Sequence, residues 1–357
     1  MLKYRKRLGI ALISLTWLAT PTAFSWAQTT VNTVPGGYFL LNIAAGTGTS
    51  ATVSLLSFPL QGSSSASNLT GAAAGQVTGL TANTITNSNA GWTAGQLSQA
   101  ATPYLIEFTS GTATGRTFLI STSTQNTATT LTIDATDASE TNLTTLGIVA
   151  GTDTYQIIPA DTISSLFGTP ATTGVLGGTS SAGVDQIQLY SPTNGWASYY
   201  YNTTSGWVKV GPPLPSGNVV VRPDTGVIYL RYAATPLTLT LTGQVPSVAR
   251  QALAVNTGIT VLSNDWPVNL TLATSSISHI PGWVTGSSAS TADQVQIYSP
   301  TSGWTGYYNN GTNWIEVGPP INSNNVAISA GSAVILIKQG STAGYSLLTE
   351  AMPYSLN

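Results

Sequence analysis

The sequence predicts an all-β protein built from two related modules, sandwich-like or barrel-like, with a small β domain inserted into the first. Three observations lead to this prediction. Short runs of β-branched and aromatic residues alternate with Gly, Asn, Ser and Pro, which is the pattern of strands joined by turns. Helical periodicity is missing after the first thirty residues. Finally, a block of residues near position 185 returns near position 293.

The first residues have the pattern of a bacterial export signal. Residues 3–7 are mostly basic, residues 8–19 are mostly apolar, and Ser25-Trp26-Ala27 places small residues where a signal peptidase cuts. A membrane anchor is the alternative, but this apolar stretch is shorter than the roughly 20 residues that a spanning helix needs. We therefore expect a signal peptide at 1–27, cleavage after Ala27, and a mature chain without a membrane span that is secreted or held at the cell surface.

The clearest strands are predicted at residues 38–43, 104–108, 117–120, 131–133, 155–158 and 237–241. In the last of these, Leu alternates with Thr. Successive side chains of a strand point to opposite faces, so one face of this strand is expected to be apolar and the other polar.

An internal repeat is the most informative feature of the chain. Residues 185–200 return as residues 293–308, with 11 of 16 positions identical. After a one-residue deletion, the match continues from residues 207–213 to residues 314–320. A looser match links residues 45–59 with residues 254–267. The pattern predicts two sibling modules.

The positions of these matches predict the domain organisation. The second module occupies residues 247–357, whereas the first is split into residues 34–62 and 160–246. Residues 63–159 form an inserted β domain, which begins with a Ser-rich linker. Inside the insert, a hairpin centred on residues 110–115 places Glu107 opposite Arg116. We expect that pair to be structural and worth about 0.2–1 kcal/mol.

Several stretches resemble an uncharacterised family of exported, β-rich bacterial proteins, known as conserved hypothetical proteins. They are residues 115–120, 153–159, 165–168, 185–201 and 237–245. The resemblance covers most of the mature chain and implies export and an all-β fold. It implies no activity, cofactor or catalytic residue.

Composition excludes several kinds of chemistry. After residue 7 the chain has 6 basic and 12 acidic side chains, a net charge of −6, so no basic surface for nucleic acid is expected. There is no cysteine, and the one histidine, His279, lies in a Ser-rich stretch and is expected to be solvated. Asp185 and Asp293 precede strands, where a carboxylate commonly accepts backbone N–H groups. We predict no enzyme activity, no cofactor and no metal site.

One acidic segment keeps two interpretations open. Asp134, Asp137 and Glu140 follow a predicted strand and supply the oxygen ligands that calcium prefers. The spacing and the turn glycine of an EF-hand are missing, so a solvated loop is the simpler interpretation.

The repeated aromatic residues are the candidates for binding. They are Trp196, Tyr199, Tyr201, Trp207, Trp304, Tyr307 and Trp314. One interpretation is that they fill the cores of the modules, since aromatic side chains bury large areas. The other is that the outward-facing members form platforms on which sugar rings stack. In that case two equivalent sites would raise avidity.

Three functions remain for such a chain. The leading hypothesis is an exported, non-enzymatic structural or adhesive protein of the surface or extracellular space, capable of self-assembly. The alternative is a non-catalytic protein that binds extracellular polysaccharide through the aromatic blocks. The third is a secreted polysaccharide hydrolase, which needs two suitably spaced carboxylates; no two acidic residues form a recognisable pair of this kind.

Overall fold

A computed structural model describes residues 35–62, 69–135, 142–339 and 345–356. Its named strands pair antiparallel and it holds one α-helix of five residues, so the prediction of an all-β protein is confirmed. The predicted signal peptide lies outside these residues, as do Asp137 and Glu140 of the acidic segment. No helix within the described residues has the length and apolar character needed to cross a membrane.

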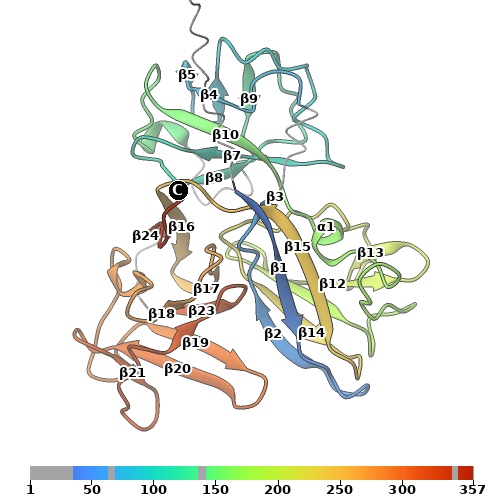
Figure 1. Cartoon of the computed structure of the whole chain (residues 1–357), viewed down its shortest axis with the longest axis vertical. Coiled ribbons are helices and arrows are strands. Elements are labelled where there is room, and N and C mark those ends of the chain that lie inside the picture. Colours follow the sequence, from blue (N-terminus) through green and yellow to red (C-terminus); the bar gives the residue numbers. More distant parts are fainter. Residues whose placement is uncertain (1–34, 63–68, 136–141, 340–344, 357) are drawn as a thin grey trace, which may run out of the picture. The chain divides into compact units, whose positions relative to one another are not determined.

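The first module contains a five-stranded sheet in the order β13-β12-β11-β14-β2. Its strands are β2 (Thr52–Leu56), β11 (Gln186–Ser191), β12 (Gly195–Asn202), β13 (Gly206–Lys209) and β14 (Val227–Arg231). A second sheet has the order β1-β15-β3, with β1 (Gly36–Ile43), β15 (Leu237–Gln244) and β3 (Gln61–Gly62). Figure 1 shows β1 running beside β15, although the two strands lie far apart in the sequence.

The two sheets of the first module enclose one apolar core, as in a β-sandwich. Leu237, Leu239 and Leu241 of β15 face this core, whereas the threonines between them are exposed, as the Leu–Thr alternation predicts. The short helix α1 (Ile163–Phe167) closes one side with Phe167, which stacks on Tyr229. The side chain of Thr162 caps this helix by accepting a hydrogen bond from the Ser165 N–H.

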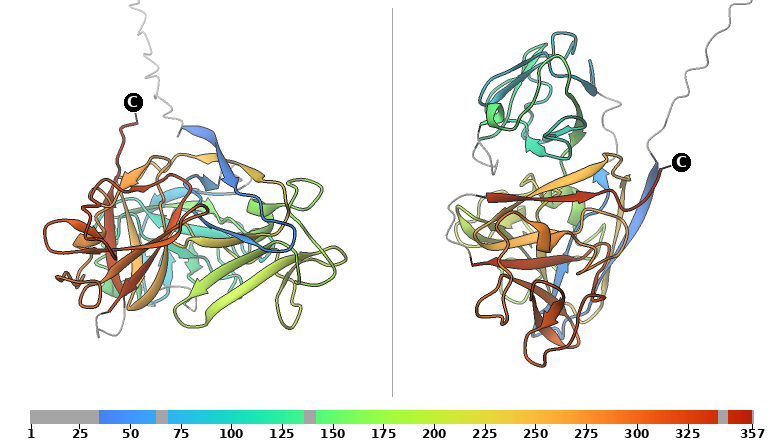
Figure 2. Two further views of the ribbon diagram at one scale, coloured as in Figure 1. Left: turned by 90° about the horizontal axis from the view of Figure 1, so that it is seen from below. Right: turned by 90° about the vertical axis from the view of Figure 1, so that its left-hand side faces the viewer.

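The second module repeats this architecture. Its five-stranded sheet has the order β17-β23-β19-β20-β21, which matches the first sheet strand for strand when the first order is read in reverse, from β2 to β13. The strands are β17 (Gly258–Ser263), β19 (Gln294–Ser299), β20 (Gly303–Asn309), β21 (Trp314–Glu316) and β23 (Ala333–Lys338). Facing it are β16 (Arg250–Asn256) and β24 (Tyr345–Ala351), while β18 (Leu270–Thr271), β22 (Ala327–Ile328) and the 3₁₀ turn η3 (Ile277–His279) complete the module. These strands, orange to red, stay together in both views of Figure 2.

Strand pairing also defines which residues of the two modules are equivalent. Leu56 lies opposite Val227 in the first module, and Leu262 lies opposite Val334 in the second. Because Val227 and Val334 belong to the repeat, Leu56 and Leu262 are equivalent. The loose sequence match aligns Pro59 with Pro267, whereas the strand pairing puts the equivalent of Pro59 two residues before Pro267. That match is therefore out of register there.

Asp185 and Asp293 have the same role in both modules. The two oxygens of Asp185 accept the N–H groups of Leu176 and Tyr232, both at 2.8 Å. Asp293 accepts those of Val284 and Gln339, at 2.8 and 2.7 Å. Each buried carboxylate thus ties the loop before one strand to the end of another, as its position in the sequence predicts. In the first module Arg231 adds an ion pair of 2.5 Å to Asp185.

The insert has a core of its own, separate from the cores of the two modules. Its strands are β4 (Ala74–Gln76), β5 (Gly79–Leu80), β6 (Thr84–Thr86), β7 (Tyr104–Phe108), β8 (Thr117–Leu119), β9 (Thr130–Thr132) and β10 (Thr154–Pro159), with the 3₁₀ turn η2 (Leu143–Thr145). The chain leaves and returns at adjacent points, since a Cβ on Gly62 would lie 2.7 Å from the Pro159 carbonyl oxygen. The structure thus has three main cores, while the domain boundaries stay a prediction.

The predicted pairing of Glu107 with Arg116 is wrong by one residue. Glu107 lies opposite Thr117. Phe108 bonds to two residues of the other strand: its N–H donates to the Arg116 carbonyl and its own carbonyl accepts from Gly115. Gly115 has a φ of +81°, so it forms a bulge that shifts the register. Loop length alone could not reveal this bulge.

The two modules contact each other through the same face of their five-stranded sheets. We call this contact the inter-module seam. Its buried residues are Leu55, Ile228, Val261 and Ala333, with Val53, Tyr190, Leu230, Tyr298 and Ile335 packed against them. The contact is reciprocal, because Leu56 bridges to Ser332 while the equivalent Leu262 bridges to Thr225, the equivalent of Ser332. The seam therefore resembles the interface of a twofold dimer within one chain.

Gly226 tests this close approach. A Cβ at Gly226 would lie 2.4 Å from the Cβ of Ala333 in the other module. An alanine Cβ cannot turn aside, so relief would require the backbone of one module to shift. We expect Gly226→Ala to lower the free energy of unfolding by about 1–3 kcal/mol, measured by denaturant unfolding. Gly37→Ala is the control, because a Cβ there meets nothing within 4 Å. Equal stability of the two variants would contradict the seam.

Candidate functional site

Four of the seven predicted aromatic residues lie inside the cores. Tyr199 and Trp207 belong to the core of the first module, and Tyr307 and Trp314 to that of the second. The exposed fraction is 4% for Trp207 and 1% for Trp314. These four side chains present no open ring face, so they stabilise the modules and are not available as stacking platforms.

Tyr201 has an intermediate position. It is half-buried and packs against the core of the first module, with its ring edge-on to Trp207 at 5.6 Å between centroids. Its equivalent in the second module is Asn309. Any role of Tyr201 in binding would therefore be confined to the first module.

Trp196 and Trp304 are the exposed members of the set. Their exposed fractions are 43% and 47%. Trp196 lies directly across the strand from Tyr190, with ring centroids 5.0 Å apart, and Trp304 lies in the same way across from Tyr298, at 5.1 Å. The duplicated modules thus carry two Tyr–Trp pairs of nearly identical geometry.

A tight turn positions each Trp. The turns at residues 191–195 and 299–303 end in Gly195 and Gly303, whose φ angles are +70° and +76°. Glycine adopts this left-handed conformation without steric cost. The Trp follows the glycine directly, and because strand residues alternate between faces, Trp196 points away from the core that Tyr199 enters.

Polar groups surround the exposed pairs. Gln188 lies opposite Ser198, and both are on the same face of the sheet as Trp196. In the second module Gln296 occupies the equivalent place and donates a hydrogen bond to the Gln294 side chain at 2.9 Å. Each aromatic pair therefore stands beside uncharged groups that can donate and accept hydrogen bonds.

Tyr190 and Tyr298 were not among the predicted site residues. Both lie inside the repeated sixteen-residue block, and both pack against the inter-module seam. Tyr190 and Trp196 lie on neighbouring strands of a hairpin. The sequence can place them on the same face only if the register that the turn sets between the two strands is known. The signal that could have identified them is their repetition beside an exposed Trp.

The first module also borders an open cavity of about 1110 Å³. It is lined by parts of Tyr199 and Trp207, by Asn194, Asn218 and Lys209, and by residues of the insert such as Leu119. The rings of Tyr199 and Trp207 reach it with little exposed area, and its lining mixes polar and apolar side chains.

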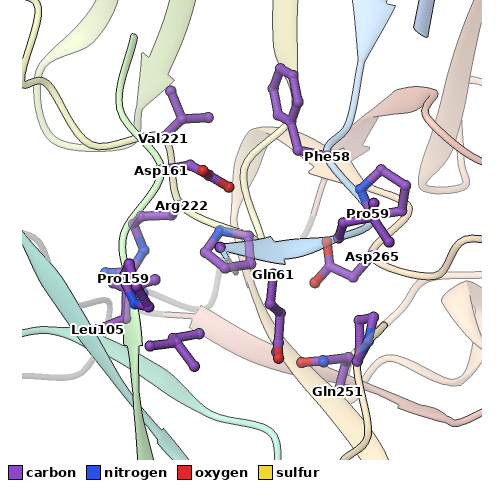
Figure 3. Close-up of a pocket in the computed structure, with 15 residues that line it drawn as sticks. Phe58, Pro59, Gln61, Leu105, Pro159, Asp161, Val221, Arg222, Gln251 and Asp265 are labelled. Carbon is purple, nitrogen blue, oxygen red and sulfur yellow. The ribbon is translucent and has the colours of Figure 1, made fainter. Parts of the chain in front are cut away.

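A much smaller cavity, of about 20 Å³, lies among residues of the insert and both modules (Figure 3). Figure 3 shows the side chains of Gln61, Gln251 and Asp265 directed into the same space. Burial raises the pKa of Asp161, which also lines this cavity, to about 6. Its volume allows about one water molecule.

The described residues contain no group of three or more His, Asp or Glu side chains that could hold a metal ion. His279 is exposed at the end of η3. Of the predicted acidic segment, Asp134 alone is described, so calcium binding there stays a prediction.

Compared with protein-family models, curated proteins and solved structures, the chain matches none of them. The resemblance to an exported hypothetical family therefore stays a prediction. The evidence for function comes from the residues themselves.

The different positions of the Trp side chains can be tested by stability. Trp207→Ala and Trp314→Ala empty core sites and should each lower the free energy of unfolding by about 3–5 kcal/mol. Trp196→Ala and Trp304→Ala remove a half-exposed ring and one aromatic contact, so a loss of about 0.5–1.5 kcal/mol is expected. Denaturant unfolding of the four variants measures this, and equal losses at all four positions would contradict the assignment.

Proposed function

We propose that this chain is an exported, non-enzymatic adhesive protein of the bacterial surface or extracellular space. Its contact points are the two exposed Tyr–Trp pairs, Tyr190–Trp196 and Tyr298–Trp304. The observation that carries the proposal is that both modules expose a Trp in the same place, on the same partner ring.

An exposed Trp is informative because this residue is usually well buried. Here the core of each module holds its own Trp, whereas Trp196 and Trp304 remain half-exposed. Aromatic residues of this kind dominate binding surfaces, since they combine a large contact area with few rotatable bonds. Two equivalent contact points on one chain increase retention on a repetitive surface.

Polysaccharide is the ligand class that the surroundings of the pairs favour. A sugar ring presents C–H groups on its faces and hydroxyl groups on its edges, so it requires an aromatic face with neutral hydrogen-bonding groups beside it. Trp196 with Gln188 and Ser198 offers this combination, as does Trp304 with Gln296. The low charge of the chain also favours a neutral ligand.

Retention on solid surfaces tests the proposal. Mature protein is incubated with cellulose, chitin and polystyrene, and the bound fraction is measured for wild type, Trp196→Ala, Trp304→Ala and the double variant. We expect each single variant to bind less and the double variant to lose retention, because two linked sites give avidity. Leu214→Ala is the control, since Leu214 is an exposed apolar residue outside both pairs.

The outcomes separate the ligand classes. Trp-dependent retention on cellulose or chitin but not on polystyrene supports polysaccharide binding. Trp-dependent retention on all three supports general adhesion. Retention of the double variant equal to that of wild type would overturn the assignment of the contact points.

A further inference from the structure

We propose that buried carboxyl groups make the contact between the insert and the two modules pH-sensitive. These groups are Glu107, Asp265 and Glu350. Together with their hydrogen-bond partners, they form what we call the acidic junction. In acid the groups are neutral and the junction is closed. As pH rises they become charged in a place without solvent, and the junction opens.

Glu107 is the centre of the acidic junction. It belongs to β7 of the insert, and its side chain is fully buried. Gln61 of β3 donates to both of its oxygens at 3.1 Å, and Gln156 of β10 donates at 2.5 Å. Gln251 of β16, in the second module, also hydrogen-bonds to it. One carboxyl group therefore connects the insert with both modules.

Backbone contacts cross the same junction. The Ala252 N–H of β16 donates to the Gly115 carbonyl of the insert at 3.2 Å. The Arg222 guanidinium, from the first module, donates to the Thr117 carbonyl at 3.0 Å. Gly115 approaches β16 so closely that a Cβ on it would lie 2.2 Å from the Arg250 carbonyl oxygen. Opening the junction would break these contacts together.

Asp265 and Glu350 lie close to Glu107 and are incompletely satisfied. Glu350 of β24 is directly opposite Gln251, the residue that reaches Glu107. Asp265 hydrogen-bonds to Ser263 and lines the small cavity of Figure 3. Within the described residues, Oδ2 of Asp265 and Oε1 of Glu350 are buried without a hydrogen bond of ordinary length, and the Trp266 indole N–H lies near enough to the Glu350 carboxyl group to lower its pKa in part. An ionised carboxylate needs such partners, whereas a neutral carboxyl group needs fewer.

Three arginines and two further carboxyl groups lie around the junction. Arg222 pairs with Asp224 at 3.2 Å, and Asp224 itself adds negative charge near Asp265. Arg250 donates to carbonyls of the insert, and Arg116 lies over the ring of Tyr345. Asp161 lines the same small cavity and adds a further acid.

Titration therefore opposes the closed junction as pH rises. Burial raises the pKa of Glu350 to about 7. Burial also raises the pKa of Glu107, although its three glutamine partners lower it in part, and it raises the pKa of Asp265 well above its usual range. Once the junction opens, these groups regain ordinary values near 4. The closed form thus binds more protons, so its stability is complete below about pH 4 and declines as pH rises toward 7.

Hydrogen exchange of the full mature chain tests this inference. Protection factors, which correct for intrinsic exchange rates, are measured for peptides covering residues 105–119 and 250–256 between pH 4.5 and 8. We expect protection of these peptides to fall at least about tenfold over this range. Protection in β19 and β20, away from the junction, should stay nearly constant.

Substitutions identify the groups responsible. Glu350→Gln keeps the shape but cannot ionise, so protection at pH 8 should exceed that of wild type and the pH dependence should shrink. Glu316→Gln, in the same module but outside the junction, should leave the wild-type profile unchanged. If the protection of these peptides in the wild-type protein did not change with pH, the inference would be overturned without any variant. An equal effect of the two substitutions on the pH dependence would also overturn it.

Discussion

Pairing between distant parts of the chain is the constraint on which the first module depends. β1 pairs with β15 and β2 with β14, across an insert of almost a hundred residues. Closing so long a loop costs conformational entropy, which the paired strands and the shared apolar core must offset. The insert reduces this cost by folding around its own core and returning to the point that it left, where Gly62 meets Pro159. In the second module, too, β16 pairs with β24 and β17 with β23, so pairing between distant strands is common to both modules.

Duplication then supplies both the seam and the exposed aromatic pairs. One face of each five-stranded sheet is buried against its own core, while part of the opposite face meets the equivalent face of its sibling. Tyr190 and Tyr298 pack along this seam, and each supports an exposed Trp. A single module would leave the residues of the seam exposed. The same packing that joins the modules thus places two contact points on one chain.

The sequence was sufficient for the fold class, the repeat and the roles of Asp185 and Asp293, because each depends on local pattern. It could not decide which repeated aromatic residues are exposed. Tyr199 and Trp196 are three residues apart, so alternation puts them on opposite faces, but which face the core covers depends on long-range packing. The bulge at Gly115 moved the partner of Glu107 from Arg116 to Thr117, which loop length alone could not reveal. The acidic junction was beyond prediction, since Gln61, Glu107 and Gln251 come together only through long-range packing.

Disulfide trapping tests the central claim, that the opening strand of the first module pairs with β15. Tyr38 lies opposite Thr242, and both are exposed, so cysteines at these positions should perturb the fold little. The chain has no cysteine of its own, which makes the result unambiguous. Tyr38→Cys with Thr242→Cys should form a disulfide, whereas Tyr38→Cys with Thr238→Cys should not, because four residues along a strand separate the thiols by about 13 Å. Equal cross-linking of the two pairs, or of neither, would contradict the account.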